Sequence, residues 1–187
     1  MSKTSQAAVQ TERSSGSPDG NAMRRAFIRK VVLNIGVGKS GEAVERASKV
    51  LQQLTGQKPS QRKAKDSIRD FGVHRGEPIG LKVTVRGDGT KELISRLLAA
   101  RDKKMADSCF DDKGSVSFGL KEHIEIPGTR YDPEIGIWGM NVSVLLERPG
   151  GRVSRRLHKP GRIGKKHVVG REEAIAFFKD QFGVVVE

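Results

Sequence analysis

The stretch VVLNIGVGKSGEAVERASKVLQQLTG, residues 31–56, decides the fold of this 187-residue chain. It opens with an apolar run, passes through a glycine-rich turn, and continues with apolar residues at helical spacing until Gly56. This pattern predicts a buried strand, a tight turn and an amphipathic helix over residues 42–55. Ser40 is the predicted N-cap of that helix.

The turn between strand and helix resembles two phosphate-binding motifs. Gly36, Gly38 and Gly41 form a G-x-G-x-x-G pattern, and the letters GVGKS lack one glycine of a P-loop. That missing glycine falls at Leu33, and the segment GQKPSQRKAK after the helix lacks the acidic strand end of a dinucleotide site. These departures argue against both motifs. A small nucleotide-binding enzyme that uses the Gly36–Ser40 turn stays an alternative hypothesis, and so does a plain turn without a ligand.

The composition predicts a polyanionic partner. The chain has 35 Lys and Arg against 22 Asp and Glu, a formal charge of +13 and a sequence pI near 10.2. Such a charge attracts nucleic acid first and an anionic membrane second. The apolar runs are too short to span a bilayer and the clearest helices carry mixed charge, so no membrane partner is expected. A single cysteine, Cys109, excludes an intrachain disulfide and fits a cytoplasmic location.

Residues 1–22 are polar with nearly balanced charges, which predicts a disordered tail without a targeting signal. Residues 23–187 are expected to form a single domain. The four histidines are scattered without metal-ligand spacing, so no metal and no cofactor is predicted. Apolar periodicity predicts further elements: a helix over 91–101 capped by Thr90, strands over 116–120 and 135–147, a helix over 172–182 and a short terminal strand.

Residues 79–86, IGLKVTVR, alternate between apolar and polar side chains. This alternation predicts a strand with one buried face and one polar face. Lys82, Thr84 and Arg86 on the polar face offer hydrogen-bond donors for sugar and phosphate groups. The uncovered side of the sheet is therefore a candidate RNA surface.

Two segments concentrate positive charge. Residues 58–75 carry six cations against two acids, which predicts a long projecting loop, either merely solvated or in contact with RNA. Residues 148–167 carry eight cations and no acid, which favours phosphate contacts over a solvated surface. Residues 102–114 lie between these segments and are predicted to form an exposed loop of mixed charge.

Several long motifs resemble one family. The segments are NIGVGKSGEA (34–43), LTGQKP (54–59), RDFGVHRGEPIGLKVTVRG (69–87), FGLKEHIEIPGTRYDPEIGIWGMNVSV (118–144) and ERPGGRV (147–153). They resemble the large-subunit ribosomal protein family that holds 5S rRNA in the central protuberance, universal protein five. The basic block and last helix resemble its archaeal and eukaryotic branch. The resemblance implies no enzyme activity and an α+β fold: an antiparallel sheet with helices packed on one face, in a single domain with long basic loops.

The same resemblance implies a set of ribosomal partners. Residues 102–114 would face a small-subunit head protein across an inter-subunit bridge, and other 5S-binding ribosomal proteins would be neighbours. A general RNA chaperone without a preferred RNA is a third hypothesis. The implied RNA contacts are Asn34, Gly36, Gly38, Lys39, Ser40, Gln57, Lys58, Thr84 and Arg86 for 5S rRNA; Arg62, Lys63, Lys65, Arg69 and Arg75 for P-site tRNA; and Arg152, Arg155, Arg156, Lys159, Lys165 and Lys166 for 23S rRNA.

Overall fold

The computed structural model describes residues 21–129 and 132–187. The predicted tail, residues 1–22, lies outside these ranges except for its last two residues. Asn21 caps a short 3-10 turn, η1 (Ala22–Arg24), with its side-chain oxygen accepting a hydrogen bond from the Met23 amide. The described chain thus begins with an ordered turn leading into the first strand.

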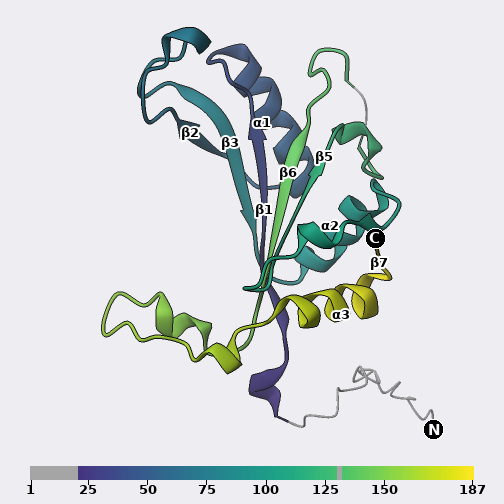
Figure 1. Cartoon of the computed structure of the whole chain (residues 1–187). Helices are drawn as coiled ribbons and strands as arrows, with labels where there is room; N and C mark the ends of the chain where they lie inside the picture. The colour runs from purple at the N-terminus through teal and green to yellow at the C-terminus, as the bar shows by residue number, and fades with distance from the viewer. Residues whose placement is uncertain (1–20, 130–131) are drawn as a thin grey trace, which may run out of the picture.

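The predicted α+β fold with an antiparallel sheet is confirmed. In the described ranges a five-stranded sheet has the order β2-β3-β1-β6-β5, and all its neighbouring strands are antiparallel. Figure 1 shows this sheet with its helices. The sheet strands are β1 (Phe27–Gly36), β2 (Ser60–Lys63), β3 (Pro78–Val85), β5 (Ser115–Leu120) and β6 (Met140–Glu147); the helices are α1 (Glu42–Thr55), α2 (Gly89–Ala99) and α3 (Arg171–Phe182); a parallel pair joins β4 (Lys104–Met105) to β7 (Val185–Val186).

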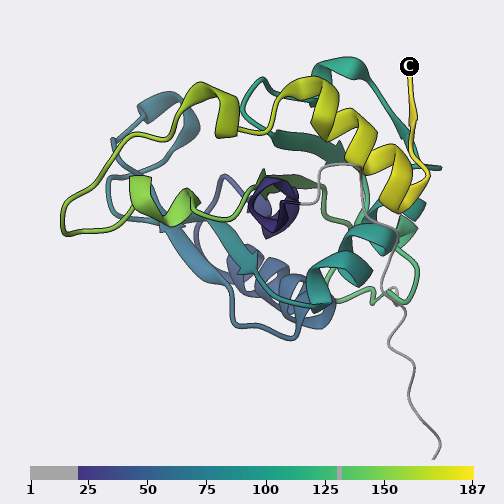
Figure 2. The same cartoon turned by 90° about the horizontal axis from the view of Figure 1, so that it is seen from below.

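Strand alternation places one face of the sheet in the core. Val31, Leu33 and Ile35 of β1 are fully buried. The register sets Leu33 opposite Val83 of β3 on one side and Val142 of β6 on the other, so the apolar rows run across strands. Figure 2 shows α1 and α2 on this side of the sheet, where α1 packs on β3 and α2 on β1. Among residues 21–129 and 132–187, no helix covers the opposite side.

Helix α3 completes the core beside β5. Its Phe178 is fully buried and meets the ring of Phe110 edge to face, with 5.9 Å between the ring centroids. Phe110 in turn pairs with Val116 of β5. The terminal strand β7 pairs with β4, where Met105 is buried. The prediction of an exposed loop over 102–114 is therefore wrong in part, because this segment contains a strand and two core residues.

The predicted loop over 58–75 is also wrong in part, because it contains a strand. Strand β2 extends the sheet beside β3, with Ser60 opposite Lys82. We call residues 64–77, which connect β2 to β3, the finger; it rises at the top of Figure 1. The Ala64 amide donates to the Glu77 carbonyl at 2.8 Å and closes its base. All four residues of β2 are exposed, which accounts for its polar sequence.

The two predicted helix caps are wrong. Gly41 is the N-cap of α1, and its φ of +97° makes a sharp turn that a residue with a side chain rarely adopts. Helix α2 begins at Gly89, before Thr90, whose hydroxyl donates to the Gly87 carbonyl at 2.7 Å. Strand β6 begins at Met140 and not at residue 135, where the predicted strand starts.

His123 is a buried histidine with a structural role. It is 2% exposed, and its Nδ1 accepts a hydrogen bond from the Trp138 amide at 3.2 Å. Burial lowers the pKa of His123 below 6.5, and the Trp138 backbone and the Glu122 charge oppose this shift only in part. The imidazole is therefore neutral near pH 7 and adds no cation to the surface.

Candidate RNA interface

The helix-free side of the sheet presents two polar rows that run across the strands. In the first row the register aligns Ser60, Lys82, Asn34 and Asn141, and the second aligns Thr84, Val32, Ser143 and Ser117. We call these eight residues the open face. Asn34, Asn141, Ser143 and Ser117 are exposed, whereas Lys82 and Thr84 are half-buried. On β1, β3, β5 and β6 the rows follow from alternation, because each of their residues flanks a buried one on its own strand.

Predicted 5S rRNA residues gather at this face and at one of its ends. Asn34 and Thr84 lie on the open face itself, and Arg86 directly follows β3 and is exposed. Strand β2 runs antiparallel to β3 with Ser60 opposite Lys82, so the residues before Ser60 extend toward Thr84. Gln57 and Lys58 are therefore at the same end of the sheet as Arg86. Residues far apart in sequence thus border one polar surface.

Six residues of the open face are absent from the predicted contact set: Ser60, Val32, Lys82, Asn141, Ser143 and Ser117. Alternation along β3 predicted that Lys82 lies on the polar face, and polar residues alternate with apolar ones in β6 and β5 in the same way. Ser117 and Ser143 hydrogen-bond to each other across the strands at 3.1 Å between their hydroxyl oxygens. Pairing between β5, β6 and β1 brings these side chains beside Asn34, and that pairing is not encoded within any one strand.

The remaining predicted 5S residues, Gly36 to Ser40, lie at the opposite end of β1. The amides of Val37 and Gly38 both donate to the Ile79 carbonyl, at 2.9 and 3.0 Å. Two donors that a phosphate cradle would present to its ligand are thus used to attach the turn to β3. Strand β1 also lies between two antiparallel neighbours, unlike the parallel strands of dinucleotide-binding folds. Both observations argue against a nucleotide enzyme.

The predicted tRNA-facing residues divide between two places. Lys65, Arg69 and Arg75 are exposed on the finger. Arg62 lies on β2 opposite Gly80, in the row that contains Gly36, and so belongs to the sheet. Lys63 follows at a register shift where β2 ends. The finger therefore carries only three of the five predicted tRNA-facing residues, and Arg62 extends the polar side of the sheet.

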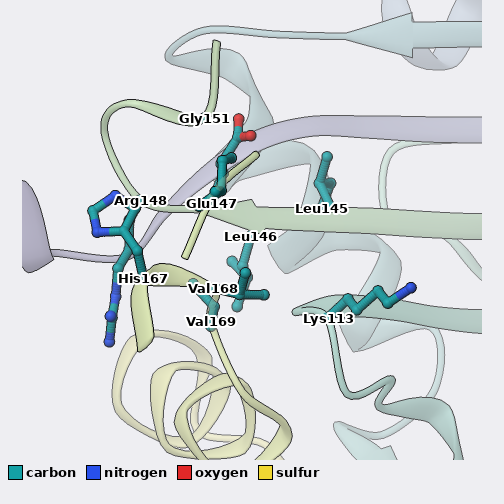
Figure 3. Close-up of a pocket in the computed structure, with 10 residues that line it drawn as sticks. Lys113, Leu145, Leu146, Glu147, Arg148, Gly151, His167, Val168 and Val169 are labelled. Atoms are coloured by element: carbon teal, nitrogen blue, oxygen red, sulfur yellow. The ribbon is translucent and has the colours of Figure 1, made fainter. Parts of the chain in front are cut away.

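Residues 148–167, which we call the arm, form a loop whose two ends are joined. Arg148 Nη1 donates to the Lys166 carbonyl at 3.0 Å, and His167 Nε2 hydrogen-bonds the Pro149 carbonyl at 2.7 Å. Figure 3 shows Arg148 and His167 among the residues that line a small cavity of about 100 Å³ at the base of the arm. Figure 2 shows the arm projecting from the helix-free side of the sheet.

Acids from outside the arm pair with two of its arginines. Arg155 Nη2 lies 2.7 and 2.6 Å from the two carboxylate oxygens of Glu147, and Arg148 pairs with Glu173. A Cβ on Gly151 would fall 1.9 Å from a Glu147 oxygen, so glycine leaves room for this carboxylate. Among the predicted 23S residues, Arg155 is thus bound within the protein. Arg152, Lys159, Lys165 and Lys166 are exposed and form no ion pair within the described ranges.

A basic α+β protein with a bare polar sheet face and two cationic projections is built to bind nucleic acid. Family models agree: "Ribosomal protein L5" matches residues 21–74, and the model for the C-terminus of the same ribosomal family matches residues 78–177. The chain belongs to the ribosomal protein L5 family. Like the family, it is a structural and non-enzymatic component of the large ribosomal subunit, and its cellular location is the ribosome in the cytoplasm.

Three relatives named "Large ribosomal subunit protein uL5" show how far the similarity extends. The protein of Pyrobaculum aerophilum is 50% identical over 90% of this chain and 94% of its own length. That of Sulfurisphaera tokodaii is 51% identical over 89% and 94%, and that of Nitrosopumilus maritimus is 48% identical over 88% and 95%. These archaeal relatives confirm the predicted branch. Within the described ranges, no helix is long and apolar enough to cross a membrane.

Proposed function

We propose that this protein binds 5S rRNA through the open face and the residues at its ends. The observation that carries the proposal is the polar surface without a helix, on which Lys82, Asn34 and Thr84 lie in adjacent rows. Amide and hydroxyl groups suit sugars, phosphates and base edges, and the central lysine supplies a charge for phosphate. With aromatic residues forming only 5% of the chain, polar and ionic contacts must provide most of the affinity.

We propose that the arm contacts 23S rRNA and thereby helps attach 5S rRNA in the central protuberance. The exposed cations Arg152, Lys159 and Lys165 support this role, because each can neutralise a phosphate. The ion pair between Glu147 and Arg155 gives that arginine a positioning role, since it holds the arm against β6. Neighbouring 5S-binding ribosomal proteins are expected to pack nearby.

We propose two further contacts on other parts of the chain. The finger carries exposed Lys65, Arg69 and Arg75 away from the sheet, which suits a contact with P-site tRNA. The segment 102–114 is assigned to an inter-subunit bridge with a protein of the small-subunit head. Arg171 pairs with Asp107 and anchors this segment to α3, so its exposed residues are presented from a fixed position.

Removing a polar group near the open face is expected to weaken 5S rRNA binding without unfolding the protein. Thr84→Ala and Gln57→Ala should each lower the affinity roughly 2- to 10-fold, the range of one lost hydrogen bond. Equilibrium binding of purified protein to 5S rRNA measures the effect. Ser95→Ala, which removes an exposed hydroxyl on α2, away from the open face, is the matched control. Unchanged affinity in both variants would remove these two residues from the interface.

Reversing the charge at the finger is expected to separate the two RNA contacts. The double variant Lys63→Glu and Arg69→Glu should bind 5S rRNA within about twofold of the unmodified protein, because Arg69 lies on the finger and Lys63 at its base. Large subunits reconstituted with this variant should hold P-site tRNA less tightly, because the two glutamates would repel the phosphates of the tRNA. A large loss of 5S affinity would show that these residues belong to the 5S surface.

A salt series distinguishes ribosomal recognition from general RNA binding. We expect a preference for 5S rRNA over a tRNA control that persists at moderate salt, because shape and hydrogen bonds add to the charge term. Equal and steeply salt-dependent affinities for both RNAs would favour the chaperone hypothesis.

A further inference from the structure

One carboxylate at the end of β6 holds two arginines from different parts of the chain. Arg29 Nε lies 3.5 Å from a carboxylate oxygen of Glu147, and Arg155 Nη2 lies 2.6 Å from the same oxygen. Arg29 belongs to β1, whereas Arg155 belongs to the arm. We call these three residues the arginine clamp. The clamp connects the sheet to the arm through a single acid.

Two local features of the backbone make room for this clamp. The register between β1 and β6 shifts between Ile28 and Lys30, so Arg29 is the extra residue of a β-bulge. A bulge redirects the side chain of its extra residue, and Arg29 reaches Glu147 in this way. Figure 3 shows the Glu147 carboxylate directed toward Gly151, where a Cβ would collide with it. The bulge and the glycine thus both serve the same carboxylate.

Each arginine contacts the acid through one nitrogen and keeps its other donors. Within residues 21–129 and 132–187, the Nη groups of Arg29 and the Nε and Nη1 groups of Arg155 have no hydrogen-bond partner. The two side chains are 42% and 43% exposed, so a ligand in solution can reach these donors. One carboxylate also leaves one of the two positive charges uncompensated. The clamp therefore has both the donors and the charge to bind a second anion.

The clamp lies where the open face meets the arm. Glu147 follows Ser143 by four residues on β6, so both side chains point to the same side of the sheet. Arg86 follows β3 at the end that pairs with Val31, and it borders the same end of the sheet as Arg29. An RNA that follows the arm toward the open face would therefore pass over the clamp.

The surroundings of the clamp fit an RNA backbone. Guanidinium groups bind phosphate through paired hydrogen bonds, and two of them near one point suit a doubly coordinated phosphate. Residues 148–167 carry eight cations and no acid, and Arg152 and Arg156 on either side of Arg155 are exposed. A strand with a phosphate in the clamp would meet further cations along the arm, whereas a single acidic side chain of a protein would not.

We propose that Arg29 and Arg155 together bind one backbone phosphate of 23S rRNA, and that Glu147 is the positioning residue for both. The inference rests on the proposed contact between the arm and 23S rRNA. The RNA is assigned as 23S because Arg155 and the cations beside it belong to the arm. Arg29 thereby joins the RNA-binding surface, and Arg155 contacts RNA in addition to holding the arm.

A salt series on the full chain tests the proposal. The complex of the protein with 5S rRNA is titrated with 23S rRNA. Arg29→Gln should weaken this binding roughly 5- to 50-fold and lower the salt slope by about one, whereas Arg29→Lys should keep the slope. Arg46→Gln is the matched control, because it removes an exposed arginine that pairs with Glu42 on α1, on the other side of the sheet. Its affinity should change less than about threefold.

Ethylation of the RNA phosphates before binding locates the contact. Ethylation of one phosphate of 23S rRNA should block binding of the unmodified protein and of Arg29→Lys. The same ethylation should have little effect on Arg29→Gln and on Arg155→Gln, which have already lost that contact. Glu147→Gln should also lose interference at this phosphate and bind 23S rRNA more weakly, although it raises the net charge by one. Tighter binding of Glu147→Gln would contradict the positioning role.

Three further outcomes would count against the inference and leave the proposed function in place. In the first, Arg29→Gln binds 23S rRNA as well as Arg46→Gln does. In the second, Arg29→Gln loses interference at many phosphates together, which would mean that Arg29 only holds the arm. In the third, the phosphate that depends on Arg29 belongs to 5S rRNA. Failure of the unmodified complex to prefer 23S rRNA over a tRNA control would instead contradict the proposed function.

Discussion

Lys82→Glu is expected to weaken 5S rRNA binding by roughly 10- to 100-fold near 0.1 M salt, and to lower the salt slope by about one. Lys82 is half-buried on β3, with Asn34 opposite it on β1 and Ser60 opposite it on β2. A carboxylate there would face phosphates from the middle of the proposed surface, so repulsion adds to the loss of one ionic contact. Filter binding or anisotropy over a salt series measures both quantities.

Lys91→Glu is the matched control for this charge reversal. Lys91 is exposed on α2, which covers the opposite side of the sheet, and the variant has the same net charge as Lys82→Glu. Its affinity for 5S rRNA should fall less than about threefold, through the long-range field alone. Equal losses in the two variants would show that 5S rRNA responds to net charge and not to the open face.

Leu33→Ala is expected to lower the free energy of unfolding by about 2–5 kcal/mol. Leu33 is fully buried in the central strand, where Val83 and Val142 flank it on the neighbouring strands. Both partners are fixed in paired strands, so the sheet has little freedom to collapse into the cavity. Denaturant unfolding followed by circular dichroism measures the loss.

Val32→Ala on the same strand is the control for the core variant. Val32 points to the open face and is half-buried, so its truncation should cost less than about 1.5 kcal/mol. Its effect should instead appear in 5S rRNA binding, because it lies between Thr84 and Ser143. Equal losses of stability at the two positions would contradict the assignment of the two faces of β1.

Much of the core was predictable from local spacing. Alternation along residues 79–86 identified Leu81, Val83 and Val85 as buried, and helical spacing over 42–55 ended correctly at Gly56. These patterns are local, because a strand repeats every two residues and a helix every 3.6. Long ordered motifs also identified the family, which the family models confirmed. The individual RNA contacts stay predictions.

The errors fall where distant residues decide local structure. The polar segment β2 forms a strand because it pairs with β3. Met105 is buried because β4 pairs with the terminal strand β7. The strong positive run of the arm concealed that Arg155 is paired, since its partner Glu147 precedes the run. Secondary-structure propensity and the number of charges along a segment give no information about these long-range contacts.

By itself, the sequence determined the class of fold, the basic character, the family and the polar or apolar side of each main strand, because these follow from composition and short-range periodicity. Only the tertiary structure decided which polar residues become neighbours, because strand register and sheet order are long-range choices. Lys82 beside Asn34, the ends of the arm joined near Glu147, and Arg29 of the sheet beside Arg155 of the arm all arise in that way.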